Sequence, residues 1–221
     1  MGLKQSKDEP TKIDMQMTQA MTERAQSGHF TIKSFNSIIM KFPKIDESFG
    51  EVRSVFKKFD KNKSGSIDLN ELQLCFKELQ VDFSQEEIQA FYKECDMDSS
   101  NVIEFKEFIV VLALVYLLGT PASQSSTGKT NKSRIGLAQL ESTFDTIVEA
   151  FVFFDRDHDG FITKDEFVGA INEAAPGKEG AEIGVQRFEE MKWNKEGRIT
   201  FKEFLFAFTD WVGLEDEIEE G

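Results

Sequence analysis

The sequence predicts an all-α protein built from two pairs of helix–loop–helix units. Three observations predict this fold: a twelve-residue pattern that occurs four times, helical periodicity around each occurrence, and a spacing that groups the occurrences two by two. At 221 residues with 40% hydrophobic composition, the chain is long enough for two small domains with apolar cores.

The four occurrences of the pattern share one register, with Ile at the eighth position and Glu at the twelfth. In chain order, loops one to four are DKNKSGSIDLNE at 60–71, DMDSSNVIEFKE at 96–107, DRDHDGFITKDE at 155–166 and KWNKEGRITFKE at 192–203. A pattern that keeps its register over four occurrences indicates an internal repeat of one structural unit.

Apolar residues at helical spacing flank the loops, so each loop is expected to join two helices. They include Phe49, Val52, Phe56 and Phe59 before loop one, Ile88 and Phe91 before loop two, Phe144, Ile147, Phe151 and Phe154 before loop three, and Phe188 and Met191 before loop four. Ser48 with Glu51, and Ser84 with Glu87, match a capping box and predict two helix starts.

The spacing of the loops divides the chain into two pairs. First residues are 36 apart in the first pair and 37 apart in the second, but 59 apart across the middle. The additional length holds a Gly/Ser/Thr/Lys-rich stretch without apolar periodicity, which predicts a flexible linker. The expected units are an N-terminal extension (1–44), a first pair (45–118), a linker (119–138), a second pair (139–213) and an acidic tail (214–221).

Loops one to three have the oxygen-rich composition that binds a hard cation such as Ca²⁺. A twelve-residue loop can surround one ion with side chains at positions 1, 3, 5 and 9, a carbonyl at 7 and a bidentate Glu at 12. The expected ligands are Asp60, Asn62, Ser64, Ser66, Asp68 and Glu71 in loop one, Asp96, Asp98, Ser100, Val102, Glu104 and Glu107 in loop two, and Asp155, Asp157, Asp159, Phe161 and Glu166 in loop three, with Thr163 acting through water. Ser66, Val102 and Phe161 would contribute carbonyl oxygens.

The turn at the sixth position favours Gly because it needs a positive φ. Loop two has Asn101 there, which enters this region at modest cost, so we still expect loop two to bind. Helix capping alone is the alternative for a single loop. It does not account for three carboxylate-rich loops, because the carboxylates within each cluster would repel one another without a cation.

These loops resemble those of the EF-hand superfamily, and their pairing is similar to plant-type calmodulin-like calcium sensors, over roughly residues 45–212. The resemblance implies that paired loops join through their eighth-position residues, so that Ile162 would pair with Ile199. Loop four has Lys192 where the first carboxylate is required, so we expect weak or absent binding there and two to three Ca²⁺ ions in total. Loop four would then be the structural mate of loop three.

Calcium sensing and calcium buffering both remain open as functions. A sensor exposes an apolar groove on binding Ca²⁺ and captures an amphipathic helix of a target protein. The apolar segments after the loops favour sensing; a permanent regulatory subunit, as in the calcineurin B-like proteins, is the other alternative. We expect no enzyme, because the chain has two histidines and no nucleophile constellation, and no nucleic-acid partner, because acidic residues outnumber basic ones by 40 to 26.

The N-terminal forty residues carry two further features. MGLKQS fits the myristoylation pattern at Gly2, with an ordinary disordered start as the alternative; one acyl chain would attach the protein only weakly to a membrane. In 29–42, Phe35, Ile38, Ile39 and Phe42 form one apolar helical face, expected either as an extra helix on the first pair or as an occupant of its groove until Ca²⁺ arrives.

The expected location is cytoplasmic or peripheral to a membrane. The first thirty residues lack a secretory apolar region, and both cysteines are expected to be reduced core thiols. The longest apolar run, 108–118, has 11 residues, whereas a bilayer span needs roughly 20. This run is therefore expected to be a buried or groove-lining helix and not a transmembrane segment.

Overall fold

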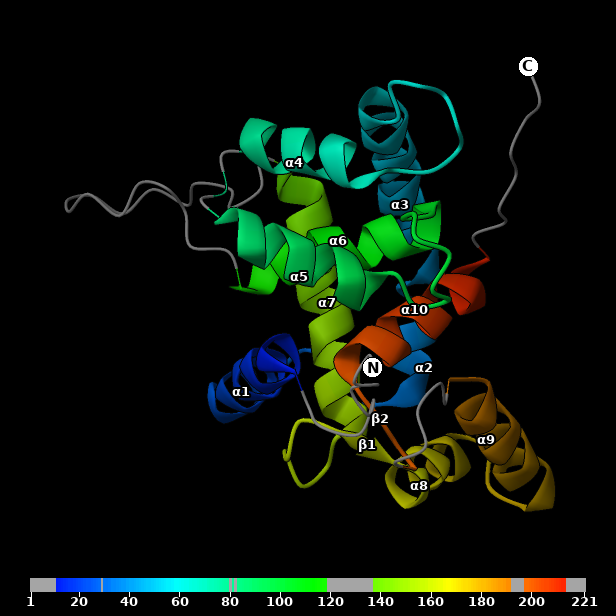
Figure 1. Ribbon diagram of the computed structural model, residues 1–221. Helices are drawn as coiled ribbons and strands as arrows, with labels where there is room; N and C mark the ends of the chain where they lie inside the picture. Colours follow the sequence, from blue (N-terminus) through cyan, green and yellow to red (C-terminus); the bar gives the residue numbers. More distant parts are fainter. Residues whose placement is uncertain are drawn as a thin grey trace, which may run out of the picture.

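The computed structural model describes residues 11–28, 30–79, 81, 83–118, 137–191 and 197–213. These residues form α1 (Lys12–Gln26), α2 (Phe35–Ile39), α3 (Phe42–Phe59), α4 (Leu69–Glu78), α5 (Gln85–Cys95), α6 (Phe105–Leu118), α7 (Ala138–Phe154), β1 (Ile162–Thr163), α8 (Lys164–Ala174), α9 (Lys178–Met191), β2 (Arg198–Ile199) and α10 (Phe201–Val212) (Figure 1). The predictions for Gly2, the linker over 119–136, Lys192 and the tail over 214–221 lie outside the described residues.

The all-α fold with paired loops is confirmed. Helices α3–α6 form the first pair and α7–α10 the second. Strands β1 and β2 are antiparallel with Ile162 opposite Ile199, as the resemblance implied. In the first pair, Ile67 N donates to Ile103 O at 2.8 Å and Ile103 N donates to Ile67 O at 2.9 Å. All four side chains are fully buried, so each loop pair closes the end of an apolar core.

The two pairs build their cores in the same way. The Phe56 ring of α3 meets Phe105 and Phe108 of α6 edge-on, with centroids 5.6 and 5.4 Å apart. One Phe ring of α7 meets two rings of α10 at 5.5 and 5.6 Å in the corresponding positions. The segment 108–115 of α6 is buried on all sides, which agrees with the expectation of a core helix.

The two pairs pack directly on each other, α3 against α7 and α6 against α10. The Phe42 and Phe208 rings lie 5.3 Å apart, and the buried Thr143 hydroxyl donates to Ser48 Oγ at 2.8 Å. Buried residues of both pairs therefore belong to one continuous apolar core, an arrangement that the sequence spacing did not indicate. Of the helices in the described ranges, none is both long and apolar enough to cross a membrane.

Helix α3 begins at Phe42, seven residues before the first helical residue that the Ser48/Glu51 match predicted, Phe49. Pro43 occupies the first turn, where a missing N–H costs nothing. Ser48 is instead fully buried within the helix, and its hydroxyl donates to the carbonyl of Lys44 at 3.0 Å. The capping box at Ser84 is confirmed as the start of α5.

Helix α2 of the segment 29–42 packs on the second pair, whereas the sequence analysis placed it on the first pair or in the groove of the first pair. Helix α2 contacts α8, and the Phe35 ring lies 6.1 Å from the Phe154 ring of α7. Helix α2 ends at Ile39, with Met40 as its C-cap, just before α3 begins. The first residue of α3, Phe42, contacts Phe208 of α10, so α2 lies close to the second pair.

Helix α1 was not predicted. It begins with a capping box between Thr11 and Asp14, and a buried residue recurs at every fourth position. These buried residues are Ile13, Met17, Met21 and Ala25. The helix lies beside α7 and α6, on the left of Figure 1.

Candidate metal centres

The twelfth-position Glu holds loops one to three closed through backbone hydrogen bonds. One carboxylate oxygen accepts from the second-position N–H of the loop and the other accepts from the ninth-position N–H. The distances are 2.9 and 3.0 Å at Glu71, 2.7 and 2.9 Å at Glu107, and 2.9 and 2.8 Å at Glu166. These three side chains therefore bring both ends of each loop to one point.

The first-position Asp sets the turn of each of these loops. One oxygen of Asp60, Asp96 and Asp155 accepts from the sixth-position N–H, at 2.9, 3.0 and 3.0 Å respectively. The sixth residues Gly65, Asn101 and Gly160 have φ values of 81°, 64° and 87°. Asn101 thus adopts the left-handed conformation expected of it, and loop two keeps the shape of the other two loops.

Loop two gathers three carboxylates and leaves one oxygen without a partner. Ligand atoms of Asp96, Asp98 and Glu107 lie within 4.8 Å of one another. Asp96 Oδ1 is buried and has no hydrogen-bond donor. Burial, together with the nearby charges of Asp98 and Asp96, raises the pKa of Glu107 to about 7. A buried carboxylate oxygen needs a positive partner, so an oxygen-binding cation fits this donor set.

Loop three gathers the carboxylates of Asp155, Asp157 and Asp159 within the same 4.8 Å limit. Asp155 is completely buried, and this burial raises its pKa to about 6, with Asp159 and Glu166 adding repulsion. Burial also raises the pKa of Asp159, against which the charge of Arg198 acts. The Arg198 guanidinium carbon lies 3.7 Å from the Phe161 ring centroid, so a positively charged side chain of loop four lies beside loop three.

Two ninth-position side chains serve as helix caps. Asp68 Oδ1 accepts from Glu71 N at 2.8 Å at the start of α4, and Thr163 Oγ1 accepts from Glu166 N at 3.4 Å at the start of α8. These contacts orient both side chains toward the first turn of the following helix. Their roles in cation binding stay predictions.

Loop one carries less charge at its centre. Ser64 N donates to Asp60 Oδ1 at 2.9 Å and to Asn62 Oδ1 at 2.8 Å, which brings these three ligand candidates together. The Ser64 hydroxyl donates to the Ser66 carbonyl at 3.0 Å. In the described residues, clusters of three acidic groups occur in loops two and three, because loop one has Asn and Ser at its third and fifth positions.

The second half of loop four keeps the structural features of the other loops. Gly197 has φ 75°, and Glu203 Oε2 accepts from Thr200 N at 2.8 Å and from its hydroxyl at 2.9 Å. The first half, which includes Lys192, lies outside the described residues.

Sequence reasoning missed two neighbours of loop three, namely α1 and Arg198. Thr22 of α1 donates from its hydroxyl to the His158 carbonyl at 3.4 Å. The four-residue spacing of buried side chains in α1 was the available signal for that helix, but its docking site is a long-range property.

Comparisons with known proteins agree with this geometry. A family model described as an EF-hand domain pair matches residues 50–111 and 144–209. The chain is 44% identical over 206 residues to "Probable calcium-binding protein CML21" of Arabidopsis thaliana, covering 93% of this chain and 87% of the relative. It is 43% identical over 213 residues to "Probable calcium-binding protein CML22" of the same plant, covering 93% and 90%.

The chain is also similar to a segment of a protein kinase. It is 23% identical over 177 residues to "Calcium-dependent protein kinase 7" of Arabidopsis thaliana, which covers 79% of this chain but 29% of the kinase. The similarity therefore leaves most of the kinase unmatched.

Proposed function

This chain belongs to the EF-hand family, within its calmodulin-like calcium-binding proteins, and on that basis we propose that it is a calcium sensor that regulates a target protein. Loops one to three bind Ca²⁺, apolar surface becomes exposed, and an amphipathic helix of the target occupies it. The observation that carries the proposal is the buried Asp96 Oδ1, which has no donor and lies beside two further carboxylates.

The proposed ligands are side-chain and carbonyl oxygens of the three loops. They are Asp60, Asn62, Ser64, Ser66, Asp68 and Glu71 in loop one, Asp96, Asp98, Ser100, Val102, Glu104 and Glu107 in loop two, and Asp155, Asp157, Asp159, Phe161 and Glu166 in loop three. When bound, Ca²⁺ supplies the positive charge that offsets repulsion among these carboxylates. The protein's own contribution is the set of backbone hydrogen bonds that fixes each loop before the ion arrives.

We propose that loop four binds no ion and supports loop three. Calorimetry on the full chain tests this with one Glu→Gln substitution per loop. E71Q, E107Q and E166Q should each lower the number of bound Ca²⁺ ions by one, whereas E203Q should leave the number at three. A fourth ion in the unchanged chain, lost in E203Q, would contradict the assignment.

The proposed target surface lies on the apolar helices that follow the loops, chiefly α6 and α10. In this structure both helices are covered, and the α6–α10 contact includes the ion pair of Lys106 with Asp210 at 2.7 Å. A target helix therefore requires these helices to separate or to lose a cover. Three Ca²⁺ ions would change the formal net charge from −14 to −8, so the natural partner is a basic amphipathic helix.

Two measurements distinguish a sensor from the alternatives. We expect Ca²⁺ to increase the fluorescence of an apolar dye and to induce binding of a basic amphipathic peptide. Calorimetric Ca²⁺ uptake without either response would indicate a buffer. A protein that co-purifies stoichiometrically in excess chelator would indicate a permanent regulatory subunit of the calcineurin B-like kind.

The division into an extension, two pairs, a linker and a tail is part of the proposal, as is acylation of Gly2 with weak membrane attachment. Intact mass of the native protein tests the acylation directly. An unmodified Gly2 would remove the membrane component and leave the sensor proposal unchanged.

A further inference from the structure

Helix α1 packs against both pairs. It contacts α5 and α6 of the first pair and α7 of the second. Its buried stripe includes Met17 and Met21, with exposed fractions of 4% and 0%. Met15, on the same helix, is 57% exposed and marks the outer face. The helix is thus docked by one face, in contact with both halves of the molecule.

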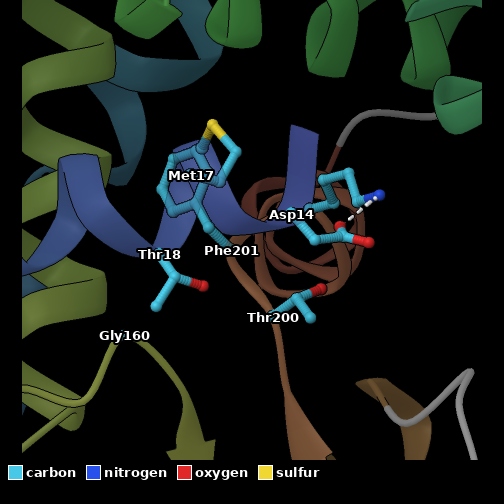
Figure 2. Close-up of a pocket in the computed structure, with 7 residues that line it drawn as sticks. Asp14, Met17, Thr18, Gly160, Thr200 and Phe201 are labelled. Carbon is cyan, nitrogen blue, oxygen red and sulfur yellow. Dashed lines mark ion pairs between the residues drawn. The ribbon is translucent and has the colours of Figure 1, made fainter. Parts of the chain in front are cut away.

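A second stripe of α1 lies against the turn of loop three. Figure 2 shows Thr18 directly above Gly160, with Thr200 and Phe201 of the second pair beside them. A Cβ atom added at Gly160 would lie 2.6 Å from Thr18 Cγ2 and 3.1 Å from its Cα and carbonyl oxygen. The backbone of α1 therefore touches the loop so closely that a side chain at this position has no room.

This contact distinguishes loop three from the other loops with glycine at the turn. Gly65 in loop one and Gly197 in loop four have positive φ values like Gly160, but a Cβ added at either would meet nothing within 4 Å. The requirement for glycine in loop three thus has two causes, the turn itself and α1.

Both ends of α1 are held by ion pairs. Near its start, Asp14 pairs with Lys202 at 2.7 Å, and Lys202 also pairs with Glu94 of α5 at 2.6 Å (Figure 2 draws the first pair). Near its end, Arg24 pairs with Asp145 of α7 at 2.8 Å. The helix is therefore positioned over loop three by contacts outside the loop.

We propose that docking of α1 and cation binding at loop three favour each other. Gly160, which α1 covers, also donates its N–H to Asp155 Oδ2, so α1 rests on the turn that orients the first ligand. Docked α1 and the gathered carboxylates of loop three occur together in this structure. The inference rests on the proposed Ca²⁺ binding by loop three. Coupling between two binding events is reciprocal. Ca²⁺ should therefore increase the docking equilibrium constant of α1 by the same factor by which docked α1 increases the Ca²⁺ affinity of loop three.

Hydrogen exchange of α1 amides in the full chain, with and without Ca²⁺, tests the coupling. In the unchanged protein we expect Ca²⁺ to slow exchange over 12–26 by about fivefold or more, the lower end of typical coupling. E71Q, which disables loop one, should keep this response, and E166Q, which disables loop three, should abolish it. An equal response in the two variants, or no response in the unchanged chain, would overturn the coupling.

The reciprocal experiment measures Ca²⁺ affinity after loosening α1. M21E places a charge in the buried stripe and should weaken the loop-three site by about the same fivefold factor. M15E makes the same change on the exposed face and should leave this site unaltered. Should M21E fail to fold, the exchange experiment still decides, because its variants leave α1 intact.

Calorimetry separates failure of the coupling from failure of the proposed function. If E166Q and the unchanged chain bind the same number of ions, loop three binds none, and both proposals are wrong. If loop three binds an ion while α1 exchange does not change, only the coupling is wrong.

Discussion

Replacement of Gly160 by Ala should destabilise the calcium-free protein far more than replacement of Gly65 by Ala. The two glycines occupy the same loop position with φ values of 87° and 81°, so both substitutions incur the left-handed backbone cost of about 1–2 kcal/mol. Only the methyl group introduced by G160A would also overlap Thr18, at 2.6 Å from Cγ2 and 3.1 Å from two backbone atoms.

The overlap adds a second cost to G160A. Overpacking by one methyl group costs about 1–3 kcal/mol, since α1 must shift as a unit. G160A is therefore expected to lose about 2–5 kcal/mol and G65A about 1–2 kcal/mol. The added cost cannot exceed the docking free energy of α1, because the helix can detach.

Urea unfolding in chelator, with helix content followed by circular dichroism, measures both losses without Ca²⁺. T18A removes the Cγ2 contact but not the backbone contacts, so the double variant T18A/G160A should recover about 1 kcal/mol relative to additivity. Losses in G160A and G65A that agree within about 0.5 kcal/mol, or full additivity of T18A with G160A, would refute the role assigned to α1.

Three further predictions follow from buried polar groups. In chelator, the raised pKa of Glu107 (about 7, against 4.5 unfolded) means that the folded state binds this proton more tightly. Its contribution to stability should therefore be present below pH 4.5 and lost as the pH rises through 7, and E107Q should flatten this part of the profile measured by urea unfolding. K202M leaves the carboxylates of Asp14 and Glu94 without their shared cation and should cost about 3 kcal/mol of unfolding free energy, whereas K58M, which removes an exposed pair, should cost less than about 1 kcal/mol. Both cysteine thiols are buried, which raises their pKa values, so a thiol reagent should label them only on unfolding.

The parts of the fold that were predictable are those encoded over short distances. The loop register follows from the Ile and Glu positions within twelve residues. The pairing of Ile162 with Ile199, which the family resemblance implied, is present in the structure. The left-handed turn at Asn101 follows from the same local reasoning. The false helix start at Ser48 shows the limit of that reasoning. A Ser three residues before a Glu also suits a helix interior, where the hydroxyl bonds to the preceding turn and to Thr143 of a distant helix.

The packing of the two pairs and of α1 depends on surfaces that no local pattern specifies. The stripe of α1 reads as an amphipathic helix, but it does not say which groove the helix enters. Its position depends on the contact of Thr18 with Gly160 and on the ion pair of Asp14 with Lys202. In both contacts the partner is more than a hundred positions away in the sequence.

The described half of loop four suggests why a loop with Lys192 at its first position keeps the rest of the pattern. Glu203 accepts the Thr200 N–H and so caps α10, a task that needs no cation. Ile199 pairs with the strand of loop three. The Arg198 guanidinium packs over the Phe161 ring, and its charge opposes the rise in the pKa of Asp159. Arg198, Ile199 and Glu203 therefore each serve loop three or the helix that follows. The contacts of 198–203 thus give this half of loop four a structural role that does not require loop four to bind an ion.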